Sequence, residues 1–333
     1  MINTLELNNL AGVILGKFHS DVLIIDLPLI TETRVIKQGK TTVEKSTRQY
    51  GEFCFSGDFH YGNSVFSEAV MHGYLNYLID HPNIQLGFMG DIIECAQLSQ
   101  FIAEENIMDI DKQIEAFCKD WGFLSSRVKF ALWGNHEERQ AQKSKTKSFM
   151  KNIIKYDLGA VSATIPDPQR GLFIVFKAGT QEYGCYVHHS KTSARVNQDI
   201  QLARSGSQNV TSIIAHGHTH RLGWKPRTFF ELTNDNNNFY TLVRRQYLLS
   251  TGCFLEYPSY AEANSMPLTE CGAPIIKFYA DEHELGYYDL TMTYHNYIKY
   301  DSAGAGSEHF DHTDIHLKHS YQSPYAENKK CLL

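Results

Sequence analysis

Residues 53–62 read FCFSGDFHYG, and this stretch decides the fold class. It begins with an apolar run typical of a buried strand and ends in a glycine-containing loop that carries Asp58 and His60. A helix is expected from about residue 64, because apolar side chains then recur at helical spacing as far as Leu78 and a proline follows at position 82. The stretch therefore predicts a strand, a polar loop and a helix in succession.

The same succession recurs twice further along the chain. Residues 84–89 predict a second strand that ends in GDIIE, and residues 128–133 predict a third that ends in GNHEE. A long helical region is expected up to about Trp121, and a helix containing several lysines at about 143–156. Mostly alternating β-rich runs follow at 172–178, 182–188, 211–215, 240–250 and 275–290. The sequence thus predicts an α/β fold whose second half is mainly sheet.

Composition and charge exclude several classes of protein. The 333 residues are 42% hydrophobic and 20% charged, so a well-packed core is expected. The net charge of −6 argues against a wholly basic nucleic-acid platform. No apolar run approaches the ~20 residues that span a bilayer, so we expect a soluble, cytoplasmic protein with no membrane partner. The seven cysteines are scattered and include no CxxC pair, which favours neither disulfides nor a cysteine zinc site.

Five short polar motifs stand directly after predicted strands. They are Asp58-Phe-His60, Gly90-Asp91, Gly134-Asn135-His136, His188-His189 and Gly217-His218-Thr-His220. Residues two apart on an extended chain point the same way, so each Asp-x-His or His-x-His pair can share one pocket. Mixed carboxylate and imidazole ligands favour Mn²⁺, Fe or Zn²⁺ over an all-oxygen cage. The ligands are too many for one ion, and we expect two ions roughly 3.5–4 Å apart.

The order of these motifs resembles that of the calcineurin-like metallophosphoesterases, over residues 53–225. The resemblance implies a four-layer αββα sandwich of two mixed β-sheets flanked by helices. It also implies hydrolysis of a phosphate ester by a hydroxide that bridges the two metals. By this resemblance Asp58, His60 and His220 would hold the first metal, Asn135, His188 and His218 the second, Asp91 would bridge them, and His136 would protonate the leaving oxygen.

The chain departs from the family pattern at two places. The fourth motif offers His188 and His189 where the family often has His-Gly, and we favour His188 with His189 as the alternative ligand. The second motif ends in Glu94 rather than the commoner Asp. Glu94 and Glu137 are expected to bond to the ligands and to His136 rather than to a metal.

The neighbouring residues narrow the branch of the family. Cys95 and Trp133 occupy positions where serine/threonine protein phosphatases carry arginines, so the chain looks closer to the phosphodiesterase and nuclease branch. That branch includes the Mre11/SbcD-type repair nucleases and phage-encoded phosphoesterases. The expected partner is a phosphate-ester substrate, with nucleic acid or a nucleotide as candidates. The basic run Lys143, Lys145, Lys147, Lys151 and Lys155 is expected to form a solvated helix face, and contact with a nucleic-acid backbone is the alternative. The alternatives are a phosphomonoesterase or nucleotide phosphatase, and a non-catalytic metal-binding scaffold of the same fold.

Three segments are expected in the chain. Residues 1–50 would form a leader of strands and an exposed loop packed on the core, and residues 51–300 the metallophosphoesterase catalytic domain. Residues 301–333 read as a polar, histidine-rich tail, in which four histidines would share one face if the segment were helical.

Overall fold

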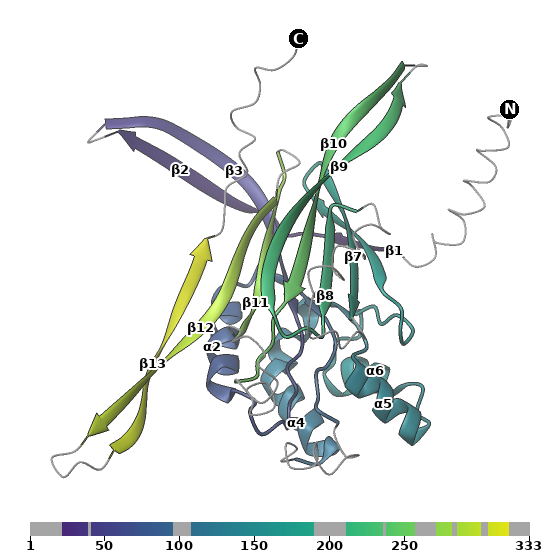
Figure 1. The fold of residues 1–333 in the computed structure, drawn as a ribbon, viewed down its shortest axis with the longest axis vertical. Coiled ribbons are helices and arrows are strands. Elements are labelled where there is room, and N and C mark those ends of the chain that lie inside the picture. The colour runs from purple at the N-terminus through teal and green to yellow at the C-terminus, as the bar shows by residue number, and fades with distance from the viewer. Residues whose placement is uncertain are drawn as a thin grey trace, which may run out of the picture.

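Two mixed β-sheets form the centre of the protein (Figure 1). The computed structural model describes residues 22–38, 41–95, 108–189, 211–235, 238–256, 271–281, 285–300 and 306–319. In spatial order, sheet A consists of β1 (Val22–Asp26), β6 (Leu172–Ala178), β7 (Gln181–His189), β8 (Ile213–Gly217), β10 (Asn238–Thr251) and β9 (Leu222–Asp235). Sheet B consists of β13 (Gly306–His319), β12 (Leu285–Tyr300), β11 (Gly272–Tyr279), β3 (Thr41–Ser56), β4 (Gln85–Phe88) and β5 (Val128–Ala131), and β2 (Ile30–Gln38) pairs with β3.

The parallel strand pairs place the polar motifs together. In sheet B, β3, β4 and β5 run parallel, with Ser56 opposite Phe88 and Phe88 opposite Ala131. In sheet A, β7 and β8 run parallel, with His189 opposite Gly217. Because parallel strands end at the same edge of a sheet, the loops after β3, β4 and β5 are neighbours, as are the loops after β7 and β8.

Aromatic side chains fill the space between the two sheets. Phe53 of β3 lies 4.7 Å, between ring centroids, from Phe176 of β6, and Phe176 lies 4.6 Å from Phe278 of β11. All three rings are fully buried. Burying side chains of this size typically contributes ~2 kcal/mol each, so this layer holds the sheets face to face.

The described helices contribute to a second core on the other face of sheet B. They are α2 (Glu68–Asp80), α4 (Ile110–Trp121), the 3₁₀-helix η2 (Gly122–Arg127), α5 (Asn135–Ser144), α6 (Phe149–Lys151) and the π-helix η3 (Asn152–Asp157). Helix α4 begins where the Asp109 side chain accepts a hydrogen bond from Lys112 N (2.9 Å). Its Phe117 and Trp121, one turn apart, pack against Phe59 and Phe88. The predicted sandwich of two mixed sheets flanked by helices is confirmed.

Several predicted boundaries were wrong. In place of one lysine-containing helix at 143–156, α5 begins at Asn135 and ends at Ser144, and α6 and η3 follow. Helix α5 begins there because Gly134 is its N-cap and Glu137 accepts a hydrogen bond from Gly134 N (2.9 Å). Residues 41–48, in a stretch where strands and an exposed loop were expected, belong to β3 of the β2–β3 hairpin, and β9 was not predicted. Residues 306–319 form β13 paired with β12, so their histidines do not lie on a helix.

Three long hairpins extend from the body of the molecule: β2–β3, β9–β10 and β12–β13 (Figure 1). Strand β3 continues without interruption across the boundary expected at residue 50, and β1 pairs with β6 at the edge of sheet A. The division into leader, catalytic domain and tail stays a prediction. Among the described residues, every helix is too short or too polar to cross a lipid bilayer.

Candidate metal centre

Five of the candidate ligands lie on unusual backbone. Asp58 (φ 51°), His60 (54°), Asp91 (48°), His218 (78°) and His220 (53°) are all in the left-handed region. This conformation costs roughly 1–2 kcal/mol for a residue with a Cβ, so the surrounding structure must enforce it. The paired residues therefore share a pocket because the loop turns left-handed there, and not because the chain is extended, as the sequence argument assumed.

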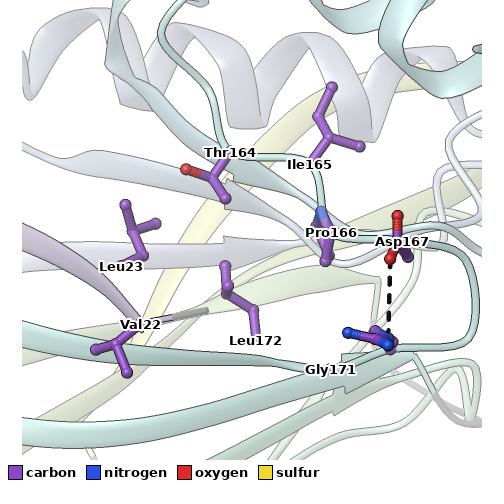
Figure 2. Close-up of a pocket in the computed structure, with 9 residues that line it drawn as sticks. Val22, Leu23, Thr164, Ile165, Pro166, Asp167, Gly171 and Leu172 are labelled. Atoms are coloured by element: carbon purple, nitrogen blue, oxygen red, sulfur yellow. Dashed lines mark ion pairs between the residues drawn. The ribbon is translucent and has the colours of Figure 1, made fainter. Parts of the chain in front are cut away.

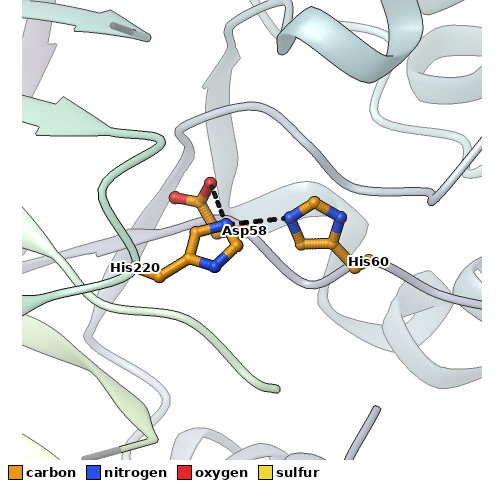
Figure 3. A group of neighbouring side chains, drawn as sticks. All are labelled: Asp58, His60 and His220. Atoms are coloured by element: carbon orange, nitrogen blue, oxygen red, sulfur yellow. Dashed lines mark hydrogen bonds and ion pairs between the residues drawn. The ribbon is translucent and has the colours of Figure 1, made fainter. Parts of the chain in front are cut away.

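Asp58, His60 and His220 form the first group of candidate ligands (Figure 3). Nε2 of His60 lies 3.1 Å from Nε2 of His220, which lies 3.5 Å from Oδ1 of Asp58. Both oxygens of the Asp58 carboxylate accept hydrogen bonds from the backbone N–H of His218, at 3.0 and 2.9 Å. This last contact joins the loop after β3 of sheet B to the loop after β8 of sheet A.

Asp91, His189 and His218 form the second group. Oδ2 of Asp91 lies 3.2 Å from Nε2 of His189 and 3.9 Å from Nδ1 of His218. The same oxygen lies 3.9 Å from Nε2 of His60, so Asp91 stands between the two groups. This is the position expected for the bridging carboxylate.

His188 lies outside both groups, which corrects the choice between the two histidines. Side chains alternate along β7, so that Val187 lies in the core between the sheets while His188 lies on the outer face, with its ring 5.6 Å from that of Tyr186. His189 lies on the inner face, within the second group of candidate ligands. The structure therefore brings His189, and not the favoured His188, into the cluster, since the pairing of β7 with β8 aligns His189 with Gly217.

The tautomers of two histidines are fixed by their neighbours. His60 donates from Nδ1 to Oε2 of Glu94 (2.7 Å), and His189 donates from Nδ1 to the carbonyl oxygen of Met89 (2.7 Å). A backbone carbonyl can only accept, so Nδ1 of His189 carries a proton, and in the neutral imidazole Nε2 is the nitrogen that presents a lone pair. Hydrogen bonds of this kind orient histidines that ligate metals in proteins.

The amide of Asn135 completes the second group. One terminal atom of this amide lies 2.7 Å from Nδ1 of His218, 3.1 Å from Oδ2 of Asp91 and 3.2 Å from Nε2 of His189. If that atom is the amide oxygen, it accepts a hydrogen bond from Nε2 of protonated His189 (3.2 Å). Once both imidazole nitrogens are unprotonated, four lone-pair atoms converge, an arrangement that a cation would stabilise. The donor set is therefore suited to a divalent ion, and its mixture of imidazole and oxygen matches Mn²⁺, Fe or Zn²⁺.

Glu94 connects a candidate ligand to the expected acid. Besides His60, its Oε2 accepts a hydrogen bond from Asn63 Nδ2 (3.0 Å), while its Oε1 lies 3.3 Å from Nδ1 of His136. His136 donates from Nδ1 to the carbonyl oxygen of Glu94. Glu94 thus takes the place beside His136 that was expected for Glu137. Asn63 was not predicted, and nothing in the sequence distinguishes it from an ordinary loop asparagine.

Glu137 instead holds two loops together. Its buried carboxylate accepts hydrogen bonds from the backbone N–H groups of Asp91 (3.1 Å), Ile92 (2.6 Å), Ile93 (3.1 Å) and Gly134 (2.9 Å). The two loops approach so closely that a Cβ at Gly134 would lie 2.1 Å from the nitrogen of Asp91. Glu137 therefore fixes the backbone on which Asp91 is presented.

The protonation of the cluster shows how its charges balance. Burial acts to lower the pKa of His60, but carboxylates, Glu94 foremost, raise it to about 9. Burial likewise opposes protonation of His189, but Asp91 and Asp58 raise its pKa to about 10. Burial raises the pKa of Asp58 to about 6. Protons on His60 and His189 thus supply positive charge that the buried carboxylates need, and bound cations would supply it in their place.

A separate cavity of about 320 Å³ lies away from these residues (Figure 2). It is lined by the start of β1 and by residues 164–167 and 170–172. Its charged side chains, Asp167 and Arg170, form an exposed ion pair with each other (3.8 Å). Its lining includes none of the candidate ligands.

Comparison with known proteins finds similarity at the level of structures alone. No family model and no curated protein matches the chain. Similar solved structures include the zinc complex of Vps29 from Entamoeba histolytica (12% identity, TM-score 0.34, covering 72% of this chain and 92% of that one). Others are the phosphoesterase Yfce from E. coli (10%, 0.35, 72% and 92%) and the NAD nucleotidase of Haemophilus influenzae (10%, 0.35, 78% and 53%). No statement about activity follows from similarities of this size.

Proposed function

We propose that this chain is a metal-dependent phosphoric ester hydrolase with two divalent cations around Asp91. The observation that carries the proposal is the placement of two groups of lone-pair side chains on either side of that one carboxylate. The order of the motifs, which resembles that of the calcineurin-like metallophosphoesterases, supports the same conclusion.

Each of the two ions would be bound by its own set of side chains, and one carboxylate would contact both. Asp58, His60 and His220 would hold one, Asn135, His189 and His218 the other, and Asp91 would contact both. When bound, the ions would make water acidic enough to supply hydroxide near neutral pH and would attract the phosphate oxygens. The family's bridging arrangement of two ions, with Mn²⁺ first and Fe or Zn²⁺ as alternatives, is part of the proposal.

His136 would act as the acid. Its Nδ1 is engaged with the carbonyl oxygen of Glu94, so the proton for the leaving oxygen would come from Nε2 of the imidazolium. Burial lowers the pKa of His136, while the carboxylates of Asp91 and Glu94 oppose that effect. Glu94 would therefore both orient the ring and favour its charged form.

A phosphodiester is the substrate class we propose first, with nucleic acid as its candidate form. This choice rests on Cys95 and Trp133, which stand where the protein phosphatases of the family carry arginines. A cytoplasmic location is likewise proposed from the sequence alone.

The test supplies Mn²⁺ to the purified protein and offers bis-p-nitrophenyl phosphate, p-nitrophenyl phosphate and single- and double-stranded DNA. We expect turnover of a diester, and a loss of roughly 100-fold or more in His136→Ala with the metal content unchanged. His188→Ala is the matched control, because its imidazole lies on the outer face of sheet A. Failure of the metal-loaded protein to hydrolyse any of these substrates would favour the non-catalytic scaffold instead.

A further inference from the structure

The peptide group between Glu94 and Cys95 is hydrogen-bonded at both of its ends. Its carbonyl oxygen accepts from Nδ1 of His136, the acid proposed above. Its N–H, on Cys95, donates to Oε1 of Gln113 (3.1 Å). The atoms of a peptide unit lie in one rigid plane, so the side chains of His136 and Gln113 are connected through that plane.

The side chain of Gln113, on α4, is itself held in a fixed position. It is fully buried, and its Nε2 donates to the carbonyl oxygen of Met108 (2.9 Å). A carbonyl oxygen can only accept and a backbone N–H can only donate, so the amide of Gln113 has one possible orientation. Gly62 packs so closely that a Cβ added there would lie 2.5 Å from Cγ of Gln113.

The backbone at Cys95 needs such support. Cys95 (φ 52°) is in the left-handed region, which costs roughly 1–2 kcal/mol for a residue with a Cβ. If this peptide group turned, the carbonyl oxygen of Glu94 would leave Nδ1 of His136. The imidazole ring would then lose a hydrogen bond that fixes its direction.

We infer that Gln113 is a positioning residue for His136: by holding the peptide plane after Glu94, it fixes the direction in which Nε2 of His136 offers its proton. This inference rests on the proposed function and deepens it. Neither of the two side-chain hydrogen bonds of Gln113 described above goes to a candidate metal ligand. The effect of Gln113 on the reaction therefore passes through the imidazole of His136.

The first experiment compares two diesters that differ in their need for an acid. The alkoxide released from single-stranded DNA needs a proton more than p-nitrophenolate does. Gln113→Met fills similar space without the amide oxygen, and it should lower kcat with DNA by about 10-fold, the effect of one lost hydrogen bond. With bis-p-nitrophenyl phosphate the loss should be less than about 3-fold, and KM should stay unchanged for both substrates. Gln113→Leu is the second variant without an acceptor.

Two further variants separate positioning from folding. Gln113→Glu keeps an oxygen acceptor for Cys95 N and should retain kcat within about 3-fold of the parent's. Ile114→Ala is the matched control, because Ile114 is the next residue in α4 and packs against the same core. It should lower stability but leave kcat with either diester within about 2-fold of the parent's. In the His136→Ala background, Gln113→Met should change kcat less than about 2-fold, since the group that it positions is gone.

The second experiment needs no turnover. In metal-free protein with isotope-labelled histidine, the magnetic resonance signal of the Nδ1 proton of His136 is identified by its loss in His136→Ala. We expect this signal to move upfield or to disappear through exchange with water in Gln113→Met, and to stay in place in Gln113→Glu and Ile114→Ala.

The role of Gln113 is overturned if that signal is unchanged in Gln113→Met, if Gln113→Met slows both diesters alike, or if its full effect persists without His136. A parent protein that hydrolyses neither diester would refute the proposed function instead. The resonance of His136 would still decide whether Gln113 positions the ring.

Discussion

His188 and His189 leave β7 on opposite faces, and this parity decides which imidazole reaches the cluster. We predict that His189→Ala lowers the affinity for the second Mn²⁺ by 10-fold or more, since a ligand and its fixed hydrogen bond to Met89 are both lost. Metal content after equilibrium dialysis measures the effect. His188→Ala should retain the parent's metal content; a loss of metal in that variant, with His189→Ala unaffected, would reverse the assignment.

Most candidate ligands could be predicted from the sequence, because each follows an apolar strand and is accompanied by a glycine. Which of His188 and His189 faces the site could not be predicted, since it depends on how β7 is paired with β8. The start of α5 was also missed, since the predicted helix began at about residue 143 and the helix in fact begins at Asn135.

At the scale of elements, the start of α5 and the loop after β4 behave as one unit. Their backbone N–H groups share the Glu137 carboxylate, and burial raises the pKa of Glu137 to about 7 despite those bonds. Glu137→Ala would leave four buried donors without their acceptor.

We predict that Glu137→Ala lowers the free energy of unfolding by about 4 kcal/mol or more, at ~1–3 kcal/mol for each buried donor. Urea unfolding of the metal-free protein measures the change. Glu138→Ala is the neighbouring control, since its carboxylate is bonded to Gln169 N rather than to the Asp91 loop. Equal losses in the two variants would contradict the special role of Glu137.

The long hairpins are the elements that the sequence predicted least well. Strand β10 pairs with β8 from Tyr247 onward. Before Tyr247, the described residues of β10 pair only with β9, so the two strands form a separate ribbon. Alternation along such a ribbon carries little of the burial signal on which strand prediction depends. Its Phe230 and Val243, which are cross-strand partners, are 75% and 53% exposed.

Isolated two-stranded ribbons are marginally stable in water. We therefore expect the amides of residues 228–235 and 238–244 to exchange hydrogen much faster than those of β8, whose side chains are buried throughout. Hydrogen–deuterium exchange followed by mass spectrometry checks this. Slow exchange of the ribbon would show that another molecule covers it.

At the scale of the whole molecule, what the sequence could not supply was the pairing of strands far apart in the chain. The βα succession predicted β3, β4 and β5 in parallel, but β3 also pairs with β11, more than 200 residues later. No local pattern records such a pairing. The two-sheet arrangement was therefore inferred from the resemblance to a known family, whereas the candidate ligands in the polar loops were predicted from the residues themselves.

The protonated cluster makes the stability of the metal-free protein depend on pH. His60 and His189 have pKa values raised from 6.5 to about 9 and about 10, so their contribution is complete below pH 6.5 and is lost as the pH rises through those values. Asp58 and Glu137, raised to about 6 and about 7, act in the same direction. The lowered pKa values of Asp91 and Glu94 act below pH 4.5, outside this range.

We predict that the melting temperature in chelator falls between pH 7 and pH 8.5, and that the increase produced by Mn²⁺ grows over the same range, because cations replace the departing protons. Thermal unfolding at constant ionic strength measures both. A melting temperature in chelator that rises with pH, or a Mn²⁺ effect that shrinks, would contradict the charge balance described for the cluster.

The candidate ligands are divided between the sheets: Asp58, Asp91 and Asn135 follow strands of sheet B, whereas His189 and His218 belong to the end of sheet A. An ion bound by both sets would link the two sheets at the edge of the sandwich where the strands end in polar loops. Heat inactivation and metal release should then occur together. A substitution that lowers activity by weakening ion binding should also shorten the half-life of the folded protein.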